Sequence, residues 1–173
     1  MKLFLHACCG PCAAYPVKFF QDKEIDFSVY YFNPNIHPIE EHLRRGEALK
    51  LLSYINNFEL IYSTAYNQGQ WKNFKGESLQ RCKMCYEIRL EETARQAKFR
   101  GFDAFSTTLL ISPYQDHDLI KSLAIGIAKK LEIEFYYEDF RPKFREGQLI
   151  ARQSELYMQR YCGCVNSLQG NGR

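Results

Sequence analysis

Short apolar runs alternate along the chain with longer stretches in which apolar residues recur every three or four positions. The short runs are rich in β-branched and aromatic residues, as is typical of strands that are buried on both faces of a sheet. We predict five such strands, over residues 2–6, 25–32, 58–63, 102–111 and 133–137.

The longer stretches have the spacing of amphipathic helices. In the second of them, Ala48, Leu51, Leu52 and Ile55 fall on one face. Pro16 is expected in the first turn of its helix, where a missing backbone N–H costs little. We predict helices over residues 13–21, 38–55, 82–99, 117–131 and 147–160.

The alternation of strands and helices predicts an α/β fold with a mainly parallel sheet and helices on both faces. We expect one domain over residues 1–167, with an irregular or weakly helical insertion at 66–80 and a frayed C-terminal tail at 168–173. Parallel strands end at the same edge of a sheet, and ligands bind at that edge. The turn after the first strand and the segment 107–115 after the fourth should therefore share one crevice.

The composition is that of an ordinary globular protein. Its 173 residues are 46% hydrophobic, which is enough apolar material for one core. The formal net charge of +3 permits contact with nucleic acid but does not by itself indicate it. The first apolar run is too short for a signal peptide, and no later stretch is long enough to span a membrane. We therefore expect a cytoplasmic protein without membrane contact.

The seven cysteines all fall into three tight groups. An odd number cannot pair completely within one chain, and disulfides are rare in a reducing cytoplasm. The clustering therefore predicts metal ligands. The groups are Cys8, Cys9 and Cys12; Cys82 and Cys85; and Cys162 and Cys164.

Two kinds of metal centre fit this set of thiols. Two cysteine pairs would complete one structural zinc site, but the three remaining cysteines would then have no role. A four-iron cluster takes four thiolates, and a further iron could bind the other three, so iron accounts for the whole set. A non-catalytic module in which zinc ties loops together remains the alternative.

The turn after the first strand has two further interpretations. Its run Cys9-Gly10-Pro11-Cys12 resembles the thioredoxin redox motif, although such a protein would not need four more clustered cysteines. The predicted topology also suits nucleotide binding, but the turn lacks a glycine-rich loop that holds phosphates. This counts against an ATP-dependent enzyme, including an iron–sulfur enzyme that thiolates tRNA, which we keep as a second alternative.

Five motifs, in a fixed order, cover nearly the whole chain. They are HACCGPC at 6–12, YFNPNIHP at 31–38, CxxCYxxRL at 82–90, FxTTL with SPY at 105–114, and YCGC at 161–164. Together these motifs resemble the cobalamin-independent epoxyqueuosine reductase family, QueH. The resemblance implies an adenine-nucleotide-hydrolase-like α/β core and an oxidoreductase that removes the epoxide oxygen from epoxyqueuosine. It implies that the substrate is the wobble nucleoside of a tRNA and that the reaction completes queuosine synthesis.

The resemblance also implies a [4Fe-4S] cluster beside a mononuclear iron, an electron donor of unknown identity and no cobalamin. On the matching positions, it gives Cys8, Cys82, Cys85 and Cys164 to the cluster. The single iron then takes Cys9, Cys12 and Cys162. Cys8 and Cys9 are expected to bind different metals, because successive residues that leave a strand can direct their side chains apart.

The remaining site residues are expected at the carboxyl ends of the strands. We assign catalytic roles to His6 and Tyr114, although a strand histidine can equally be a core residue. Arginine and lysine are expected to bind tRNA phosphates, and aromatic residues to stack on bases, unless they are plain surface. The substrate-binding candidates are Asn33, Asn35, His37, Thr107, Thr108, Gln115 and Arg89. The tRNA candidates are Arg141, Lys143 and Arg145, then Arg44, Arg45, Arg81 and Lys83, with Trp71, Phe74 or Tyr157 for stacking.

Overall fold

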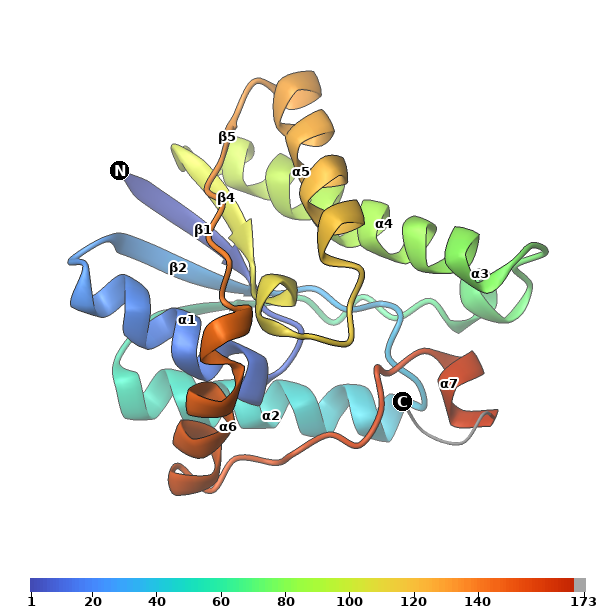
Figure 1. The fold of residues 1–173 in the computed structure, drawn as a ribbon, viewed down its shortest axis with the longest axis horizontal. Coiled ribbons are helices and arrows are strands. Elements are labelled where there is room, and N and C mark those ends of the chain that lie inside the picture. The colour runs from blue at the N-terminus through green and yellow to red at the C-terminus, as the bar shows by residue number, and fades with distance from the viewer. Residues whose placement is uncertain (170–173) are drawn as a thin grey trace.

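Five parallel strands form one sheet in the order β3-β2-β1-β4-β5 (Figure 1). The computed structural model describes residues 1–169 of the chain. The central strand, β1, is buried from Leu3 to His6, as its unbroken apolar run predicts. The strands are β1 (Lys2–His6), β2 (Asp26–Tyr31), β3 (Glu59–Tyr62), β4 (Ala104–Thr107) and β5 (Glu134–Phe135).

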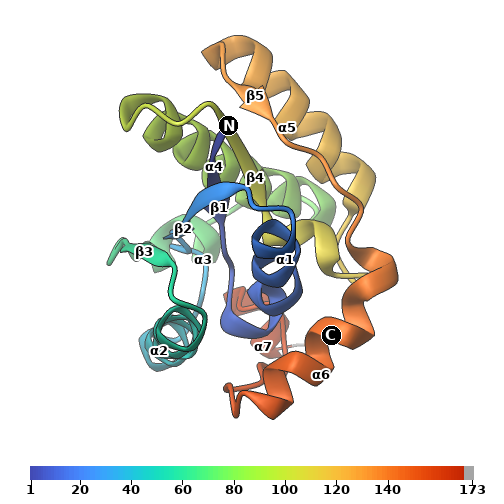
Figure 2. The ribbon, with the colours of Figure 1, turned by 90° about the vertical axis from the view of Figure 1, so that its left-hand side faces the viewer.

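Helices cover both faces of this sheet. In the side view, α1, α2 and α6 lie on one face, and α4 and α5 lie on the other (Figure 2). The predicted α/β class and parallel sheet are therefore confirmed. The helices are α1 (Gly10–Asp22), α2 (Ile39–Asn56), α3 (Gln68–Lys72), α4 (Ser78–Phe99), α5 (His117–Leu131), α6 (Phe144–Gln153) and α7 (Val165–Gln169). Two short 3₁₀ turns are η1 (Thr108–Ile111) and η2 (Arg141–Lys143).

The direction of winding reverses between β1 and β4. The chain runs outward from β1 to β3 on one side and from β4 to β5 on the other. Open α/β sheets bind ligands at such a switch point, outside the carboxyl ends of the strands. There the backbone N–H of Cys8 donates to Thr108 Oγ1 at 3.2 Å, so the expected meeting of the two segments is confirmed.

Two helices begin earlier than predicted because their caps are not the usual ones. Cys9 caps α1, and its sulfur accepts from the backbone N–H of Cys12 at 3.4 Å. Pro16 consequently lies inside α1, and its placement in the first turn is wrong. Glu77 caps α4 in a reciprocal pair with Gln80, so the insertion predicted as irregular or weakly helical contains α3 and the first turn of α4.

The C-terminal part differs most from the prediction. The predicted helix at 147–160 is wrong, because α6 is already helical at Phe144 and stops at Gln153. Strand β4 stops at Thr107, where η1 begins. Of the expected tail, residues 168–169 end α7, whereas 170–173 lie outside the described residues. No helix in the described range is long and apolar enough to cross a membrane.

Candidate metal centre

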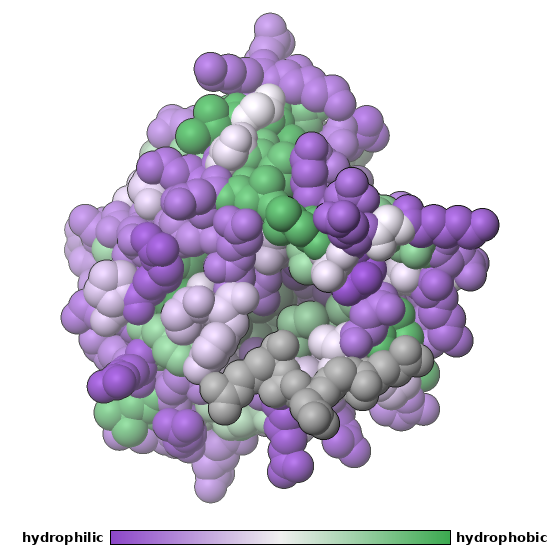
Figure 3. Space-filling view, turned by 45° about the vertical axis from the view of Figure 1, so that its right-hand side comes forward, coloured by the Kyte–Doolittle hydropathy of each residue, from purple (hydrophilic) through white to green (hydrophobic). Residues whose placement is uncertain are grey.

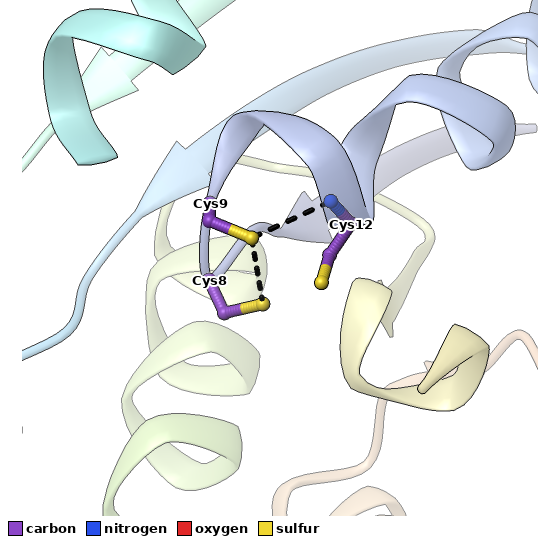
Figure 4. Close-up of side chains that lie close together, drawn as sticks. All are labelled: Cys8, Cys9 and Cys12. Atoms are coloured by element: carbon purple, nitrogen blue, oxygen red, sulfur yellow. Dashed lines mark hydrogen bonds between the residues drawn. The ribbon is translucent and has the colours of Figure 1, made fainter. Parts of the chain in front are cut away.

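Three thiols meet where β1 gives way to α1. The sulfurs of Cys8, Cys9 and Cys12 all lie within 4.8 Å of one another and point into one space (Figure 4). Those of Cys8 and Cys9 are 3.7 Å apart. The prediction that these two side chains point apart is therefore wrong. The physical reason is that the chain has already left the strand at this point, because Cys9 is the cap of α1.

The spacing of this triad suits a single metal ion. Two thiolates on one tetrahedral ion, each about 2.3 Å from the metal, are about 3.8 Å apart. Ligands of a four-iron cluster bind different irons and are more widely spaced. Three converging thiolates would also leave one position of a tetrahedral ion open. This arrangement differs from the expected division, in which Cys8 joins the cluster and Cys162 joins Cys9 and Cys12.

Negative charge concentrates on Cys8. Hydrogen bonds from Cys12, Cys9 and then Thr108 lower the pKa of the Cys8 thiol well below its usual range, although burial opposes this. Burial raises the pKa of Cys9. Two buried guanidinium groups, those of Arg45 and Arg89, face these sulfurs and keep raised pKa values despite their burial. The site is thus built to hold thiolate charge.

The other four cysteines form a second, looser group. Cys82 and Cys85 lie one turn apart at the start of α4, and Cys162 and Cys164 lie in the loop before α7. Burial raises the pKa of Cys82, and the nearby thiols of Cys162 and Cys164 raise it further. Within residues 1–169, however, no three of these four sulfurs lie within 4.8 Å of one another. Unlike the triad, these sulfurs therefore do not converge on one ion.

A buried ion pair on α2 holds this C-terminal loop. Arg45 Nη1 and Nη2 donate to the backbone carbonyls of Cys162 at 3.1 Å and Tyr161 at 2.8 Å. Its Nε donates to Glu41 Oε1 at 2.8 Å, and the Tyr157 hydroxyl donates to Glu41 Oε2 at 2.7 Å. Arg45 is only 2% exposed, so its predicted contact with tRNA phosphates is wrong. Its role was missed because its partners are 116 and 117 residues away in sequence.

Gly163 allows the C-terminal cysteine loop to pack closely against α2 and the turn before it. Its φ of +106° is in the left-handed region. A Cβ at this position would lie 3.0 Å from Ile36 Cγ1 and 3.1 Å from Arg45 Nη1. The Gly163 carbonyl accepts from the His37 N–H at 2.7 Å, and the Tyr161 hydroxyl donates to the His37 carbonyl. The loop between the two C-terminal cysteines is thus tied to both α2 and the turn before it.

Gln159 is a further site residue that sequence reasoning missed. Its Nε2 lies 2.8 Å from Cys9 Sγ and 3.7 Å from Cys12 Sγ. An amide N–H beside a thiolate stabilises the negative charge. Gln159 follows α6 in an irregular segment, and no local pattern in the sequence marks it.

A cavity of about 610 Å³ opens beside the triad. Cys8, Cys12 and Cys162 line it, as do Tyr114 and Gln115 from the segment after η1. Its lining also contains arginines from α2, α4, α6 and the segment after α6, and no aspartate or glutamate. Those arginines are Arg45, Arg89, Arg145, Arg152 and Arg160.

Four residues with a predicted catalytic or substrate-binding role lie near the triad. Tyr114 is 66% exposed and lines the cavity. Gln115 also lines it, with Oε1 accepting from the Tyr86 hydroxyl at 2.6 Å. Arg89 lines it as well, with Nε donating to the Cys85 carbonyl at 3.1 Å. Thr108 Oγ1 lies 3.6 Å from the Cys8 sulfur, so all four residues border either the triad or its cavity.

His6, by contrast, has the position of a structural residue. It is fully buried, and its Nδ1 lies 2.9 Å from Thr107 Oγ1 and its Nε2 3.1 Å from the Phe32 carbonyl oxygen. The carbonyl can only accept, so Nε2 carries the proton and the Thr107 hydroxyl donates to Nδ1. Burial lowers the pKa of His6 to about 4. Both ring nitrogens are engaged, which corrects the assignment of His6 as a catalytic residue.

The turn after β2 also builds the scaffold rather than the cavity wall. Asn33 Nδ2 donates to the Ala7 carbonyl at 2.8 Å and so fixes the approach to Cys8. Asn35 is buried, and the His37 ring packs against Trp71. Thr107 binds His6, and neither it nor these three turn residues line the cavity. Trp71 is 1% exposed, so it is not available to stack on a base.

The predicted tRNA-binding group on η2 and α6 is divided. Arg141 Nη2 lies 2.7 Å from Asp139 Oδ2, and Lys143 Nζ lies 3.0 Å from Glu146 Oε2. Both positive charges are therefore locally neutralised. Only Arg145 of this group lines the cavity.

Comparison with known proteins assigns the chain to a protein family. The model of the family described as epoxyqueuosine reductase QueH matches residues 3–170. The epoxyqueuosine reductase QueH of Dehalococcoides mccartyi is 41% identical over 96% of this chain and 92% of its own. That of Thermotoga maritima is 34% identical over 96% of this chain and 90% of its own.

Solved structures add only the fold. A deacetylase from teicoplanin biosynthesis superimposes with a TM-score of 0.58 at 9% identity, covering 89% of this chain and 83% of its own. A zinc-inhibited teicoplanin deacetylase gives 0.55 at 8% identity, with the same coverage. These similarities show a related α/β fold. Sequence and motif order together show that the chain belongs to the epoxyqueuosine reductase QueH family.

Proposed function

We propose that this chain is an oxidoreductase that reduces epoxyqueuosine to queuosine in tRNA, the final step of queuosine synthesis. The observation that carries the proposal is the buried triad of Cys8, Cys9 and Cys12 beside a cavity at the switch point of the sheet. The family of the chain supports the same reaction. The resemblance implies a reaction that needs no cobalamin, and it does not identify the electron donor.

We propose that all seven cysteines hold iron, in a division that the triad spacing favours. Cys8, Cys9 and Cys12 would hold a mononuclear iron, because their sulfurs have the separation of ligands to one ion. Cys82, Cys85, Cys162 and Cys164 would hold a [4Fe-4S] cluster, because their thiols are near enough to shift one another's pKa but do not converge on one ion. Relative to the sequence-based division, Cys8 and Cys162 exchange places.

The reaction adds two electrons and two protons to the epoxide and releases an alkene and water. When bound, the iron centres would supply the electrons and the Lewis acidity, which amino-acid side chains cannot. The protein residues bind and orient the substrate. Gln115 and Arg89 on the cavity wall are placed to hydrogen-bond the nucleoside, and Thr108 orients Cys8. Tyr114 Oη has no hydrogen-bond partner within residues 1–169 and is free to donate a proton to the departing oxygen.

Two features weigh against the alternatives. A structural zinc site is closed by its ligands, whereas two of the triad cysteines line an open cavity. An ATP-dependent enzyme of this topology would place phosphates at the start of α1. There, the sulfur of Cys9 already accepts the Cys12 N–H.

The test is anaerobic incubation with tRNA that contains epoxyqueuosine and a chemical reductant, followed by mass spectrometry of the released nucleosides. Iron-loaded protein should lower the mass of the modified nucleoside by one oxygen. Protein loaded with zinc instead should leave it unchanged, because zinc does not transfer electrons. Equal conversion with zinc would overturn the redox role of the metals, and no conversion with iron would overturn the proposed function.

A further inference from the structure

Three exposed arginines stand on the C-terminal side of the cavity. Arg145 and Arg152 are seven residues apart on α6, so they project from the same face of the helix. Arg160 follows in the segment after α6. All three line the cavity, and all three are exposed to solvent.

These arginines differ from their neighbours in having no counter-charge. No carboxylate within residues 1–169 lies within 4.0 Å of any of the three, whereas Arg141 and Lys143 beside them are paired with Asp139 and Glu146. The cavity lining itself has no aspartate or glutamate. The three arginines together carry as much positive charge as the net charge of +3 on the whole chain, and they carry it at one place. Such an uncompensated group attracts a polyanion.

We propose that Arg145, Arg152 and Arg160 form an arginine rim that binds the phosphates of the tRNA anticodon loop. The inference rests on the proposed function and specifies where the RNA backbone lies. Enzymes that act on a base extrude it into a pocket, and the phosphates on either side of that nucleotide stay outside. The cavity volume of about 610 Å³ lies in the range of small-ligand pockets, so it can receive a modified nucleoside.

The arginine rim includes a neutral polar neighbour. On the face shown in Figure 3, hydrophilic side chains cover most of the surface, and a hydrophobic patch lies above a hollow near the centre. Gln148 lies on the same side of α6, between the first two rim arginines, and lines the cavity with them. The contacts of such a rim are made to phosphates, so they orient the loop without reading its sequence. Recognition of the modified nucleoside is then left to the cavity.

The experiment compares two triple variants that lose the same charge. The test variant is Arg145→Gln, Arg152→Gln and Arg160→Gln. The control is Arg95→Gln, Arg141→Gln and Lys143→Gln, whose positive charges lie beside Glu91, Asp139 and Glu146. The dissociation constant for an unmodified tRNA with the correct anticodon is measured by fluorescence anisotropy at several salt concentrations, on iron-loaded protein that retains the wild-type circular dichroism.

The rim variant should bind at least about 10-fold more weakly at low salt. The slope of log K against log salt should fall by about 2, since each lost phosphate contact to single-stranded RNA accounts for about 0.7. The control should keep the wild-type slope. An unchanged slope in the rim variant, or an equal loss in the control, would overturn the rim. Because this measurement involves no turnover, its failure is distinct from a failure of oxygen removal.

Discussion

Arg45 Nη1 on α2 lies 3.1 Å from the carbonyl oxygen of Cys162. This contact is one of several that join the first half of the chain to the C-terminal cysteine loop. It is made by a side chain that is itself held by Glu41 and is almost fully buried. The cysteine pair at the end of the chain is thus positioned by a helix that contributes no cysteine.

Replacing Arg45 should therefore damage both stability and the metal centre. Arg45→Met leaves the buried Glu41 carboxylate without its counter-charge, and breaking a buried ion pair typically costs about 3–5 kcal/mol. Urea denaturation should show a loss of this size, and the iron content after reconstitution should fall by about four per chain. Lys50→Met, which breaks an exposed pair with Glu47, should cost at most about 1 kcal/mol and leave the iron content unchanged. Full iron content in Arg45→Met would contradict the role of this contact.

Gly163 should not tolerate a side chain. Gly163→Ala imposes a Cβ 3.0 Å from Ile36 at a positive φ, and we expect a destabilisation of about 1–3 kcal/mol. Gly126→Ala in the middle of α5 is the matched control, because a Cβ there meets no atom within 4 Å. It should be stabilising by about 1 kcal/mol. Denaturant midpoints of the two variants that shift in the same direction would refute this interpretation of the loop.

Gln159 should strengthen metal binding by the triad of Cys8, Cys9 and Cys12. Gln159→Leu removes the N–H that lies 2.8 Å from Cys9 Sγ, and loss of a hydrogen bond to a metal-bound ligand typically costs about 10–100-fold in metal affinity or activity. Competition with a chelator measures the affinity, and the nucleoside mass assay measures the activity. Gln148→Leu changes a cavity residue that does not contact sulfur and should retain near-normal affinity. Wild-type affinity and activity in Gln159→Leu would exclude this role.

The stability should fall in acid partly because of His37. Burial first, then the positive charges of Lys72 and His42, lower its pKa from 6.5 to about 4. The unfolded chain therefore binds a proton at higher pH than the folded chain, so stability is lost as the pH falls from about 6.5 toward about 4. At about 1.4 kcal/mol per pKa unit, the full loss is about 3 kcal/mol.

His37→Phe tests this titration. A phenyl ring keeps the packing against Tyr66 and Trp71 but cannot take up a proton. The free energy of unfolding, measured by urea at several pH values, should fall less steeply below pH 6.5 in the variant than in the wild type. Parallel curves for the two proteins would show that His37 does not titrate as described.

The sequence predicts the scaffold well and the contacts of the site poorly. Strand β1 and helix α5 have the predicted bounds, because each is set by a local pattern of apolar residues that ends at turn residues. The start of α4 was missed because its cap is Glu77, which is not among the usual capping residues. The end of α6 was missed because the amphipathic pattern continues past Ser154, although the backbone turns at Glu155 with a φ of +54°.

In the metal centre, too, local sequence patterns predict some features and long-range contacts determine the others. Cysteine spacing predicts which residues are candidates, since that information is local. It does not predict that Cys8 and Cys9 converge, because this depends on where α1 begins. The loop carbonyls that Arg45 binds and the thiols that Gln159 contacts are more than one hundred residues away along the chain, and only the folded structure brings them together.

The most direct measurement is anaerobic removal of oxygen from epoxyqueuosine-containing tRNA by iron-loaded Cys9→Ser beside the wild type. The visible absorption of the [4Fe-4S] cluster serves as the control for the four cysteines outside the triad. We predict that the variant keeps this absorption and loses conversion by at least about 100-fold, because its single-iron site lacks one thiolate. Wild-type conversion by Cys9→Ser would contradict the claim that the triad is the site of reduction.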